Sequence, residues 1–334
     1  MSFSLTKPYP RLWSLDAGLV MVVTDLHGDW NAYQSYRNRF LDLQAEGKAD
    51  CLIFTGDLIH QESSPAQDCS LEIVLDILKL QSSYGSTIIY LCGNHELPHI
   101  YSIGLGKGDV EYTPSFEAAL SRSGHRSVII DLLDALPFYV RTAAGVSITH
   151  AGAAAVAADR RSMSKLFSWS HKKQLADASI LLEEKDTEKL RRGYAKLSQA
   201  ESYEALARHY LAVTGPSDPR FDDLLRGAFA TGGDYNLVHS ALFTKCEQEY
   251  GVREYSRLLK AMLEQLSTNY IPQQILVAGH MKLSGGYEIV AERHLRLASA
   301  HHAVPPEAGL YLLFDAAKPI KTIEDLLAGL DSVY

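Results

Sequence analysis

The sequence has few cysteines, no long hydrophobic run and no excess of basic residues. Its 334 residues include four cysteines, which are scattered and form no CxxC pair. Neither a disulfide framework nor a zinc knuckle is therefore indicated. No stretch approaches the roughly 20 apolar residues that a membrane-spanning helix needs, and the first residues lack the apolar run of a secretory signal. We expect a cytoplasmic protein without a membrane partner.

The charge balance argues against a general polyanion-binding surface. The formal net charge is -8, whereas nucleic-acid-binding domains usually carry a basic patch on a basic background. We therefore expect no nucleic-acid partner, and any phosphate must be met locally, for instance by metal ions. The composition is that of an ordinary globular protein, and the length fits one large domain with an insert or two domains. The sequence leaves the oligomeric state open.

Strand and helix patterns alternate in the first third of the chain. Short β-branched runs predict strands at residues 19–23, 51–54 and 87–91, and helical periods lie between them at 33–45 and 71–80. A strand pair is expected at 138–141 and 146–149. Alternation of this kind is typical of an α/β fold.

The middle of the chain has a different character. Residues from about 157 to 265 are rich in Ala, Leu, Lys, Glu and Arg and have helical periods, for example at 186–197 and 202–213. Strand patterns then return at residues 274–278, 287–291, 294–298 and 309–314. We expect the last segment to rejoin the first sheet system around a helical insert.

Polar residues that bind metals follow one strand-like run after another. They are Asp25 and His27 in TDLHGDW, Asp57 in FTGDLIH, Asn94 and His95 in LCGNHE, His150 in SITHAG, and His280 in LVAGHM. In open α/β sheets, sites gather at the carboxyl ends of strands, where these loops fall. Asp, Asn and His supply oxygen and imidazole ligands that suit manganese, iron or zinc and suit calcium poorly. A carboxylate such as Asp57 can bridge two ions about 3.5 to 4 Å apart, which then clamp a nucleophile and phosphoryl oxygens.

These motifs resemble those of the calcineurin-like metallophosphoesterase superfamily. The likeness is greater to its phosphoprotein phosphatase (serine/threonine phosphatase) branch, whose signatures read GDxHG, GDxxDRG, GNHE, HGG and GH. The resemblance implies a four-layer α/β/β/α sandwich whose catalytic core comprises residues 1–156 and 266–334. Residues 157–265 would form a helical insert or cap, as in a divergent member of bacterial type.

The resemblance also implies a role for each matched residue. Asp25, His27 and Asp57 would hold one metal ion, and Asp57 would bridge to a second ion held by Asn94, His150 and His280. His95 would be the general acid, since an imidazole can donate a proton to the leaving oxygen near neutral pH. The cofactors would be two divalent ions, either Mn or an Fe/Mn mixture, with Zn as the alternative.

One departure from the branch concerns support for the catalytic imidazole. Where the family reads GDxxDRG, this chain has His60 and Gln61 in place of the Asp-Arg pair. The carboxylate that orients the imidazole and the Arg that binds phosphate are thus both replaced. Glu96 and His99 are candidates for the missing support, although Glu96 is equally suited to fixing its own loop.

A second departure concerns the basic residue that the branch places before its last His. Arg226 in LLRGAF and Lys245 in ALFTKC are equal candidates for this phosphate contact. His301 and His302 fall where the family has a loop beside its site. We expect them to be surface residues, with a substrate contact as the alternative.

Together these features predict an enzyme that hydrolyses phosphate monoesters through a metal-bridging hydroxide. The substrate would be a phosphoprotein, as for a protein serine/threonine phosphatase, or a small phosphoester. A nucleotide phosphodiesterase or dinucleotide polyphosphate hydrolase is the alternative within enzymes. The lost Asp-Arg pair and a cap that narrows access favour a non-protein substrate. The alternative of another class is a metal-binding pseudo-phosphatase scaffold, against which the retention of His95 and all six metal ligands argues.

Overall fold

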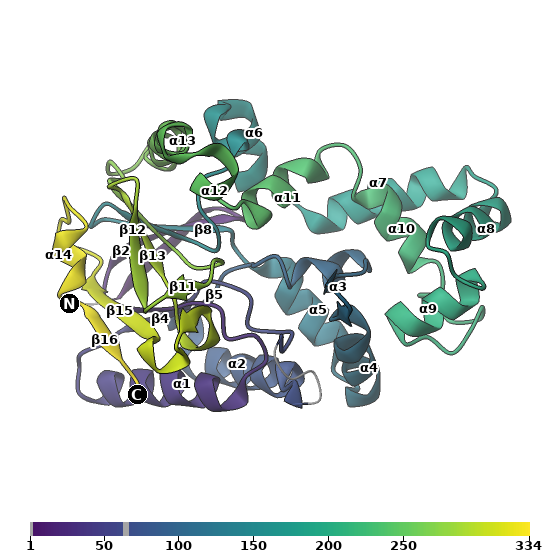
Figure 1. Ribbon diagram of the computed structural model, residues 1–334, viewed down its shortest axis with the longest axis horizontal. Coiled ribbons are helices and arrows are strands. Elements are labelled where there is room, and N and C mark those ends of the chain that lie inside the picture. The colour runs from purple at the N-terminus through teal and green to yellow at the C-terminus, as the bar shows by residue number, and fades with distance from the viewer. Residues whose placement is uncertain (1–2, 63–66) are drawn as a thin grey trace.

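Two β-sheets lie face to face in the body of the protein (Figure 1), whose computed structural model describes residues 3–62 and 67–334. The larger sheet has the order β1-β2-β8-β9-β10-β13-β12 and consists of β1 (Ser4–Tyr9), β2 (Leu12–Ala17), β8 (Tyr139–Thr142), β9 (Val146–Thr149), β10 (Ile275–Ala278), β13 (His294–Leu297) and β12 (Tyr287–Val290). The smaller sheet has the order β16-β15-β3-β4-β5 and consists of β16 (Leu330–Ser332), β15 (Leu310–Asp315), β3 (Leu19–Val23), β4 (Cys51–Phe54) and β5 (Ile88–Tyr90). Two further strand pairs are β6 (Gly106–Lys107) with β7 (Val110–Glu111), and β11 (Leu283–Ser284) with β14 (Ala303–Val304).

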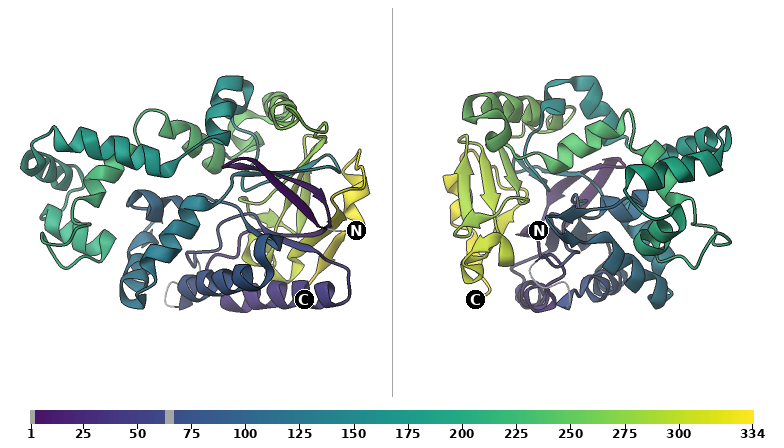
Figure 2. Two further views of the ribbon diagram at one scale, coloured as in Figure 1. Left: turned by 180° about the vertical axis from the view of Figure 1, so that it is seen from behind. Right: turned by 45° about the vertical axis from the view of Figure 1, so that its right-hand side comes forward.

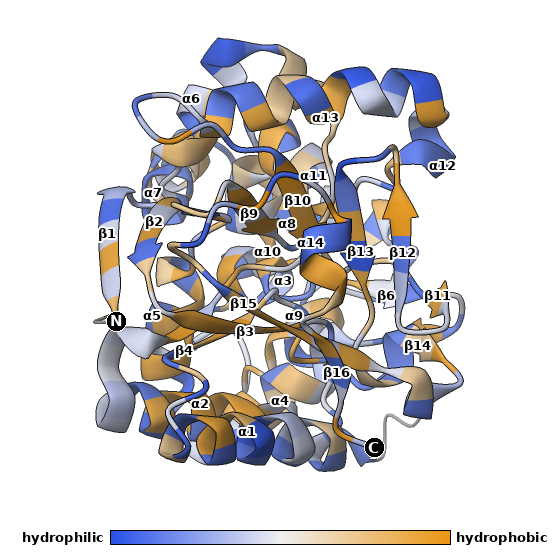
Figure 3. Ribbon diagram, turned by 90° about the vertical axis from the view of Figure 1, so that its left-hand side faces the viewer, coloured by the Kyte–Doolittle hydropathy of each residue, from blue (hydrophilic) through white to orange (hydrophobic). Residues whose placement is uncertain are grey.

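The central strands are apolar on both faces, because each sheet is covered on both sides. Successive side chains of a strand point to opposite faces. In β3, Val20 and Val22 belong to the core between the two sheets, whereas Met21 and Val23 pack against helices. Figure 3 shows the same hydrophobic character in β9 and β10 of the larger sheet.

Helices cover the outer face of each sheet. The smaller sheet is covered by α1 (Trp30–Ala45) and α2 (Ser70–Tyr84), and the larger by α6 (Arg160–Phe167) and α13 (Val252–Leu266) (Figure 1). Both α1 and α13 alternate polar and apolar bands (Figure 3), as a helix with one buried face requires. The predicted four-layer α/β/β/α fold is therefore confirmed.

The two ends of the chain share both sheets. Strand β10 pairs in parallel with β9, and β15 pairs antiparallel with β3. The C-terminal strands thus rejoin the first sheet system, as their sequence patterns predicted. This pairing brings loops that are distant in the sequence to one edge of the body.

The chain between β9 and β10 is mainly helical. After α6 come α7 (His171–Glu183), α8 (Thr187–Leu197), α9 (Tyr203–Leu211), α10 (Asp223–Ala230), α11 (Tyr235–Phe243) and α12 (Glu247–Tyr250). Helices α7 to α10 project from the body as an arm, which Figure 2 shows from two further sides. The arm has its own core, which includes Tyr203, Phe221 and Leu224. The division into a core and a cap domain stays a prediction.

The arm packs against the body at the helices that follow β5. These are α3 (Leu97–Tyr101), α4 (Thr113–Ser123) and α5 (Arg126–Ala135), and α9 packs against α4. Further helices of the described ranges are α14 (Glu324–Leu327) and the 3-10 turns η2 (Gly85–Thr87), η3 (Ala155–Ala158), η4 (Ala300–His302) and η5 (Pro306–Ala308). Over the described ranges, no helix combines the length and apolarity needed to cross a membrane.

Candidate active site

The residues singled out in the sequence follow neighbouring strands and meet at one edge of the two sheets. Asp25 and His27 follow β3, Asp57 follows β4, Asn94 and His95 follow β5, His150 follows β9, and His280 follows β10. All of these side chains are buried except that of His280, which is half-buried. Parallel pairing of β3 with β4, β4 with β5, and β9 with β10 aligns the carboxyl ends of these strands.

The backbone at this edge is strained. Positive φ angles occur at Asp25 (26°), His27 (43°), Asp57 (51°), His60 (72°) and His280 (69°). Asp and His tolerate this region better than most residues, but each such position costs about 1 to 3 kcal/mol. Five of them at one edge are typical of a functional site whose geometry the surrounding fold enforces.

Two motif glycines allow the strand-end loops to approach each other. A Cβ atom on Gly93 would overlap the carboxylate of Asp57, and one on Gly279 would overlap that of Asp25. Their roles are steric, because any side chain would push the two carboxylates away from the edge.

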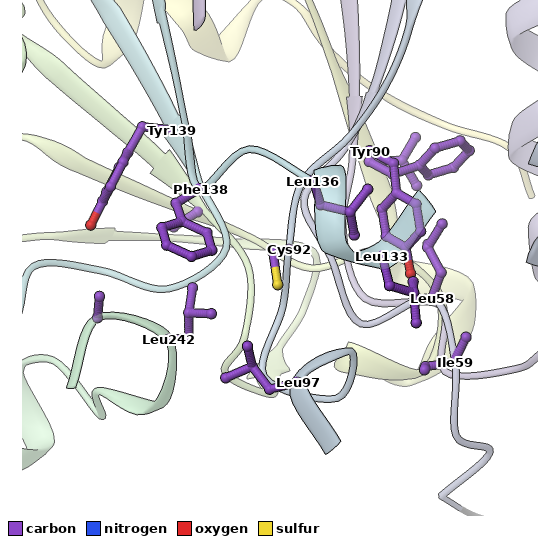
Figure 4. Packing of buried hydrophobic residues seen from close by; sticks show 14 of the residues in the cluster. Leu58, Ile59, Tyr90, Cys92, Leu97, Leu133, Leu136, Phe138, Tyr139 and Leu242 are labelled. Carbon is purple, nitrogen blue, oxygen red and sulfur yellow. The ribbon is translucent and has the colours of Figure 1, made fainter. Parts of the chain in front are cut away.

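Glu96 holds these loops in place through hydrogen bonds. Its carboxylate accepts hydrogen bonds from the backbone N–H groups of Asp57 (3.1 Å) and Gly93 (2.7 Å) and from the Tyr90 hydroxyl (2.6 Å). Of its two predicted roles, the structure therefore supports the loop-fixing one. Figure 4 shows the apolar base beneath, where Leu58, Ile59, Tyr90, Cys92 and Leu97 pack with residues that include Leu133 and Leu136.

One group of electron-pair donors converges on His150. Its Nδ1 atom lies 3.1 Å from the carbonyl oxygen of Thr55, which can only accept, so Nδ1 carries the proton. The lone pair of Nε2 then faces Asn94 Oδ1 at 2.9 Å, His280 Nδ1 at 3.0 Å and Asp57 Oδ2 at 3.5 Å. Such a set has the donors that a divalent transition metal prefers. The hydrogen bond to Thr55 is the outer contact that usually orients a metal-binding His.

A second group contains Asp25, His27 and a residue from the C-terminal stretch, His302. His27 Nε2 lies 2.9 Å from His302 Nε2, and His302 Nδ1 lies 3.6 Å from Asp25 Oδ1. Asp25 Oδ1, His27 Nδ1 and His302 Nδ1 are buried without a hydrogen-bond partner. Buried polar atoms are nearly always satisfied, so Asp25 Oδ1 and His302 Nδ1, which face each other, fit a bound cation. The two groups adjoin, since His150 Nδ1 is 3.9 Å from Asp25 Oδ1.

The expectation that His301 and His302 lie on the surface is wrong for His302. Its side chain is buried against His27, whereas His301 is part-exposed and bonds to Asp29 Oδ2 at 2.5 Å. The two neighbours point in different directions because they belong to the 3-10 turn η4, in which successive side chains diverge. The family-like position of this loop was the available signal, but it does not say which of the two residues turns inward.

His95 lies beside both groups. Its backbone N–H donates to Asp57 Oδ1 at 2.9 Å, and its Nε2 atom lies 4.0 Å from Asp57 Oδ2. Its other ring nitrogen, Nδ1, lies 3.1 Å from His60 Nδ1. The ring therefore presents Nε2 to the metal-candidate residues and Nδ1 to the position where the family has a carboxylate.

Burial controls the charge of these groups. It lowers the pKa of His27 and His280 to about 4 and lowers the pKa of His150 well below its ordinary value, so these rings are neutral at pH 7. It also raises the pKa of Asp25 and Asp57 well above the ordinary carboxyl value. Neutral imidazoles are the metal-binding form, whereas two buried carboxyls need positive charge nearby to ionise.

Two lysines approach these groups through an ion pair with Glu62. Glu62, which lies near His27 and His95, pairs with Lys282 at 2.8 Å and with Lys107 at 3.5 Å. Neither lysine was singled out in the sequence. Lys282 follows His280 closely enough to have been noticed, but nothing in the sequence links Lys107 in β6 to the site.

The two predicted phosphate-binding candidates lie in different surroundings. Lys245 is close enough to His280 to contribute to the lowering of its pKa, after the larger effects of burial and His27. Arg226 forms an ion pair with Asp223 within α10 of the arm. In the part of the chain that the structure describes, no hydrogen bond or ion pair joins Arg226 to the metal-candidate residues.

Comparison with known proteins gives a family match. The model of the calcineurin-like phosphoesterase family matches residues 18–210 of the sequence. No curated protein matches the sequence. Similar solved structures include a protein serine/threonine phosphatase from Saccharomyces cerevisiae with similarity to human phosphatase PP5 (13% identity, 88% of this chain and 72% of that chain, TM-score 0.46). They also include a cold-active protein-tyrosine phosphatase of a psychrophilic Shewanella (15%, 92% and 78%, 0.43) and a metallophosphoesterase from Sphaerobacter thermophilus (10%, 93% and 92%, 0.32).

Proposed function

The chain belongs to the calcineurin-like phosphoesterase family, as a metal-dependent phosphoesterase, and we propose that it hydrolyses phosphate monoesters at the edge where β3, β4, β5, β9 and β10 end. The observation that carries this proposal is the convergence of Asn94 Oδ1, His280 Nδ1 and Asp57 Oδ2 on His150 Nε2. Oxygen and nitrogen atoms placed this closely have the positions that ligands take around a divalent cation.

We assign the metal ligands to two sets that share Asp57. One ion would be held by Asp25, His27 and Asp57, and the other by Asp57, Asn94, His150 and His280. His302 is a further ligand candidate for the first ion, because it is buried beside Asp25 and His27. The mixed oxygen and imidazole donors favour Mn or an Fe/Mn pair, with Zn as the alternative.

Within this site, His95 is proposed as the general acid. When bound, two divalent ions lower the pKa of water and neutralise the phosphoryl oxygens. The leaving oxygen then needs a proton, and His95 Nε2 is the ring nitrogen that faces Asp57. Burial lowers the pKa of His95 well below its ordinary value, so its protonated form requires anionic neighbours. The carboxylates of Asp57 and Glu62 lie beside it.

Phosphate binding is assigned to lysines rather than to the Arg of the family pattern. Lys282 and Lys107 share the carboxylate of Glu62, and the charge of Lys245 makes a small contribution to the lowered pKa of His280, after burial, His27, Arg296 and Lys107. A monoester carries up to two negative charges, which suits several cations better than the single charge of a diester does. Phosphoproteins and small phosphomonoesters both fit this chemistry.

The proposal is tested by metal reconstitution followed by a substrate panel. Chelator-treated protein should regain about two equivalents of Mn by elemental analysis, together with activity on a phosphopeptide, a nucleotide monophosphate, a sugar phosphate or an aryl phosphate. Greater activity on a phosphodiester than on every monoester would assign the chain to the alternative class of hydrolase. Binding of Mn without hydrolysis of any substrate would identify a pseudo-phosphatase scaffold.

A further inference from the structure

A continuous chain of hydrogen bonds leads from His95, away from the metal-candidate residues, to a buried carboxylate. His95 Nδ1 lies 3.1 Å from His60 Nδ1, and His60 Nε2 lies 2.7 Å from His99 Nε2. His99 Nδ1 lies 2.9 Å from Glu117 Oε1. All four side chains are buried. We call His60, His99 and Glu117 the histidine relay.

The direction of these hydrogen bonds is set at the far end of the relay. Glu117 Oε2 accepts hydrogen bonds from Arg126 at 3.1 Å and from Arg220, at the edge of the arm, at 3.4 Å. Burial alone would raise the pKa of Glu117, but the hydrogen bond from His99 and the charge of Arg126 hold it below its ordinary value. Glu117 is therefore an ionised carboxylate, which can only accept, so His99 Nδ1 carries the proton.

In the state in which all three imidazoles are neutral, each ring has one N–H group and one lone pair, so this direction is passed from ring to ring. With its proton on Nδ1, His99 accepts at Nε2 from His60. His60 then accepts at Nδ1 from His95. His95 thus holds a proton on Nδ1, and its Nε2 atom is left to face Asp57 at 4.0 Å.

We propose that the histidine relay positions His95, holding its ring in the tautomer and orientation from which Nε2 can donate a proton. This inference rests on the proposed role of His95 as the general acid. As the leaving oxygen takes the proton, the Nε2–H bond breaks, its electron pair stays on Nε2, and the ring keeps its Nδ1 proton. The neutral ring that remains is the tautomer that the relay already favours, so the surroundings need no rearrangement. The family pattern has an Asp carboxylate at the position of His60. In this chain Glu117 takes the role of that carboxylate and acts on His95 through the two imidazoles of His60 and His99.

The first test replaces the carboxylate at the end of the relay. In Glu117→Gln the amide can donate to His99 and reverse every hydrogen bond up to His95. The kcat for an alkyl phosphate should fall by about 10- to 100-fold, the range for outer partners that orient a functional His. The kcat for nitrophenyl phosphate should change by less than about 3-fold, because its leaving group needs little protonation. The Mn content should stay the same.

A matched control separates orientation from loss of stability. Arg126→Gln removes one ion pair from the same carboxylate, while Arg220 and the hydrogen bond from His99 still stabilise the ionised form of Glu117. It should lower Tm about as much as Glu117→Gln while leaving the ratio of alkyl to aryl kcat unchanged. If Glu117→Gln does not fold, His99→Phe takes its place, since it removes both nitrogens from the relay at a position that already packs against Phe116.

A rescue experiment gives the sharpest outcome. His60→Asp places a carboxylate next to His95, at a positive φ that Asp tolerates. In that background Glu117→Gln should cost less than about 3-fold on the alkyl phosphate, since His95 no longer depends on the relay. An undiminished cost in the double variant would mean that Glu117 acts on activity by another route, and would overturn the proposal.

The failure of this inference is distinguishable from failure of the proposed function. If His95→Asn lowers the alkyl-to-aryl ratio but Glu117→Gln and His99→Phe do not, the relay proposal is overturned and the acid role of His95 stands. If His95→Asn leaves the ratio unchanged, the acid role itself falls. NMR of nitrogen-labelled histidines adds a direct readout. The His95 signal, assigned through its loss in His95→Asn, should report a proton on Nδ1 in the unsubstituted protein and on Nε2 in Glu117→Gln.

Discussion

Two sets of buried histidines lie side by side in this protein and differ in what surrounds them. Around His150, lone pairs of nitrogen and oxygen converge, and His27 and His302 leave their Nδ1 atoms unsatisfied. In the histidine relay, the ring nitrogens of His60 and His99 all have partners, and an ionised carboxylate terminates the chain. The first set needs nearby positive charge to stabilise its converging lone pairs. In the second set, hydrogen bonds alone satisfy every ring nitrogen.

The difference shows that burial by itself does not define the role of an imidazole. Burial lowers the pKa of both His150 and His60 well below the ordinary value. What separates them is whether the neighbours of the ring can supply protons or only lone pairs. His95 stands at the boundary, with Nδ1 toward the relay and Nε2 toward the metal-candidate residues.

The largest effect should come from Asp57→Asn, which removes the charge shared by both proposed ions. We expect kcat/KM to fall by about 10⁴-fold or more, because without the ions water keeps its ordinary pKa of about 15.7 rather than one near 7. Elemental analysis should show loss of metal. In contrast, His60→Asn, in the relay, should retain its Mn. Full metal occupancy in Asp57→Asn would contradict the assignment of Asp57 as a ligand shared by the two ions.

The next largest effect is expected from replacing His95, which lies between the two sets. His95→Asn should lower kcat on an alkyl phosphate by about 10²- to 10⁴-fold, the usual worth of a positioned proton donor. The loss should be smaller on nitrophenyl phosphate, and Mn content should be unchanged because His95 is not assigned as a ligand. Loss of Mn from His95→Asn would move this residue from the boundary into the metal-binding set.

The fold was predictable from the sequence wherever strands are buried on both faces. The runs at residues 19–23 and 51–54 are apolar throughout, and they match β3 and β4. The first two strands carry a weaker pattern. Four of the six residues of β1, SLTKPY, are exposed, and it is an edge strand with a proline, so no apolar run marks it.

The site was predictable to the extent that strand ends carry it. Five motifs, each directly after a strand, supplied the six proposed ligands and His95. His302 was considered only as a substrate contact and Glu117 was not considered at all, because a turn and a helix packed against the edge bring them to the site and no spacing rule connects them to the motifs. His99 was suggested by proximity alone. Its partner Glu117 required the packing of α3 beside α4.

A third experiment tests whether His302 belongs to the metal-binding set by comparing it with the adjacent histidine. His302→Gln should weaken binding of one Mn equivalent by about 10- to 100-fold, since even outer partners of a metal ligand are worth that much. His301→Gln is the matched control, because His301 is part-exposed and bonds to Asp29 outside the cluster. Equal Mn affinities for the two variants would exclude His302 from the set.

The last prediction concerns the pH dependence of Mn affinity, which distinguishes the two sets by the protons they exchange. Burial raises the pKa of Asp25 and Asp57, so in the metal-free protein these carboxyls hold protons at pH values where an exposed carboxyl has lost them. Burial lowers the pKa of His27 and His280 to about 4, so these rings hold no displaceable proton above about pH 5.5. Binding of Mn must therefore displace carboxyl protons, and its affinity should rise with pH.

The rise should be up to about tenfold per pH unit for each proton displaced, from about pH 5.5 to about pH 8, the raised pKa of Asp25, and it should level off only once both carboxyls ionise without metal. Calorimetric titration with Mn in buffers of different ionisation enthalpy measures the proton release directly. Asp25→Asn should release fewer protons, whereas His60→Asn should release as many as the unsubstituted protein, because the N–H groups of the relay stay in place. Proton release that falls in His60→Asn but not in Asp25→Asn would show that the relay, rather than the buried carboxyls, exchanges protons with the metal.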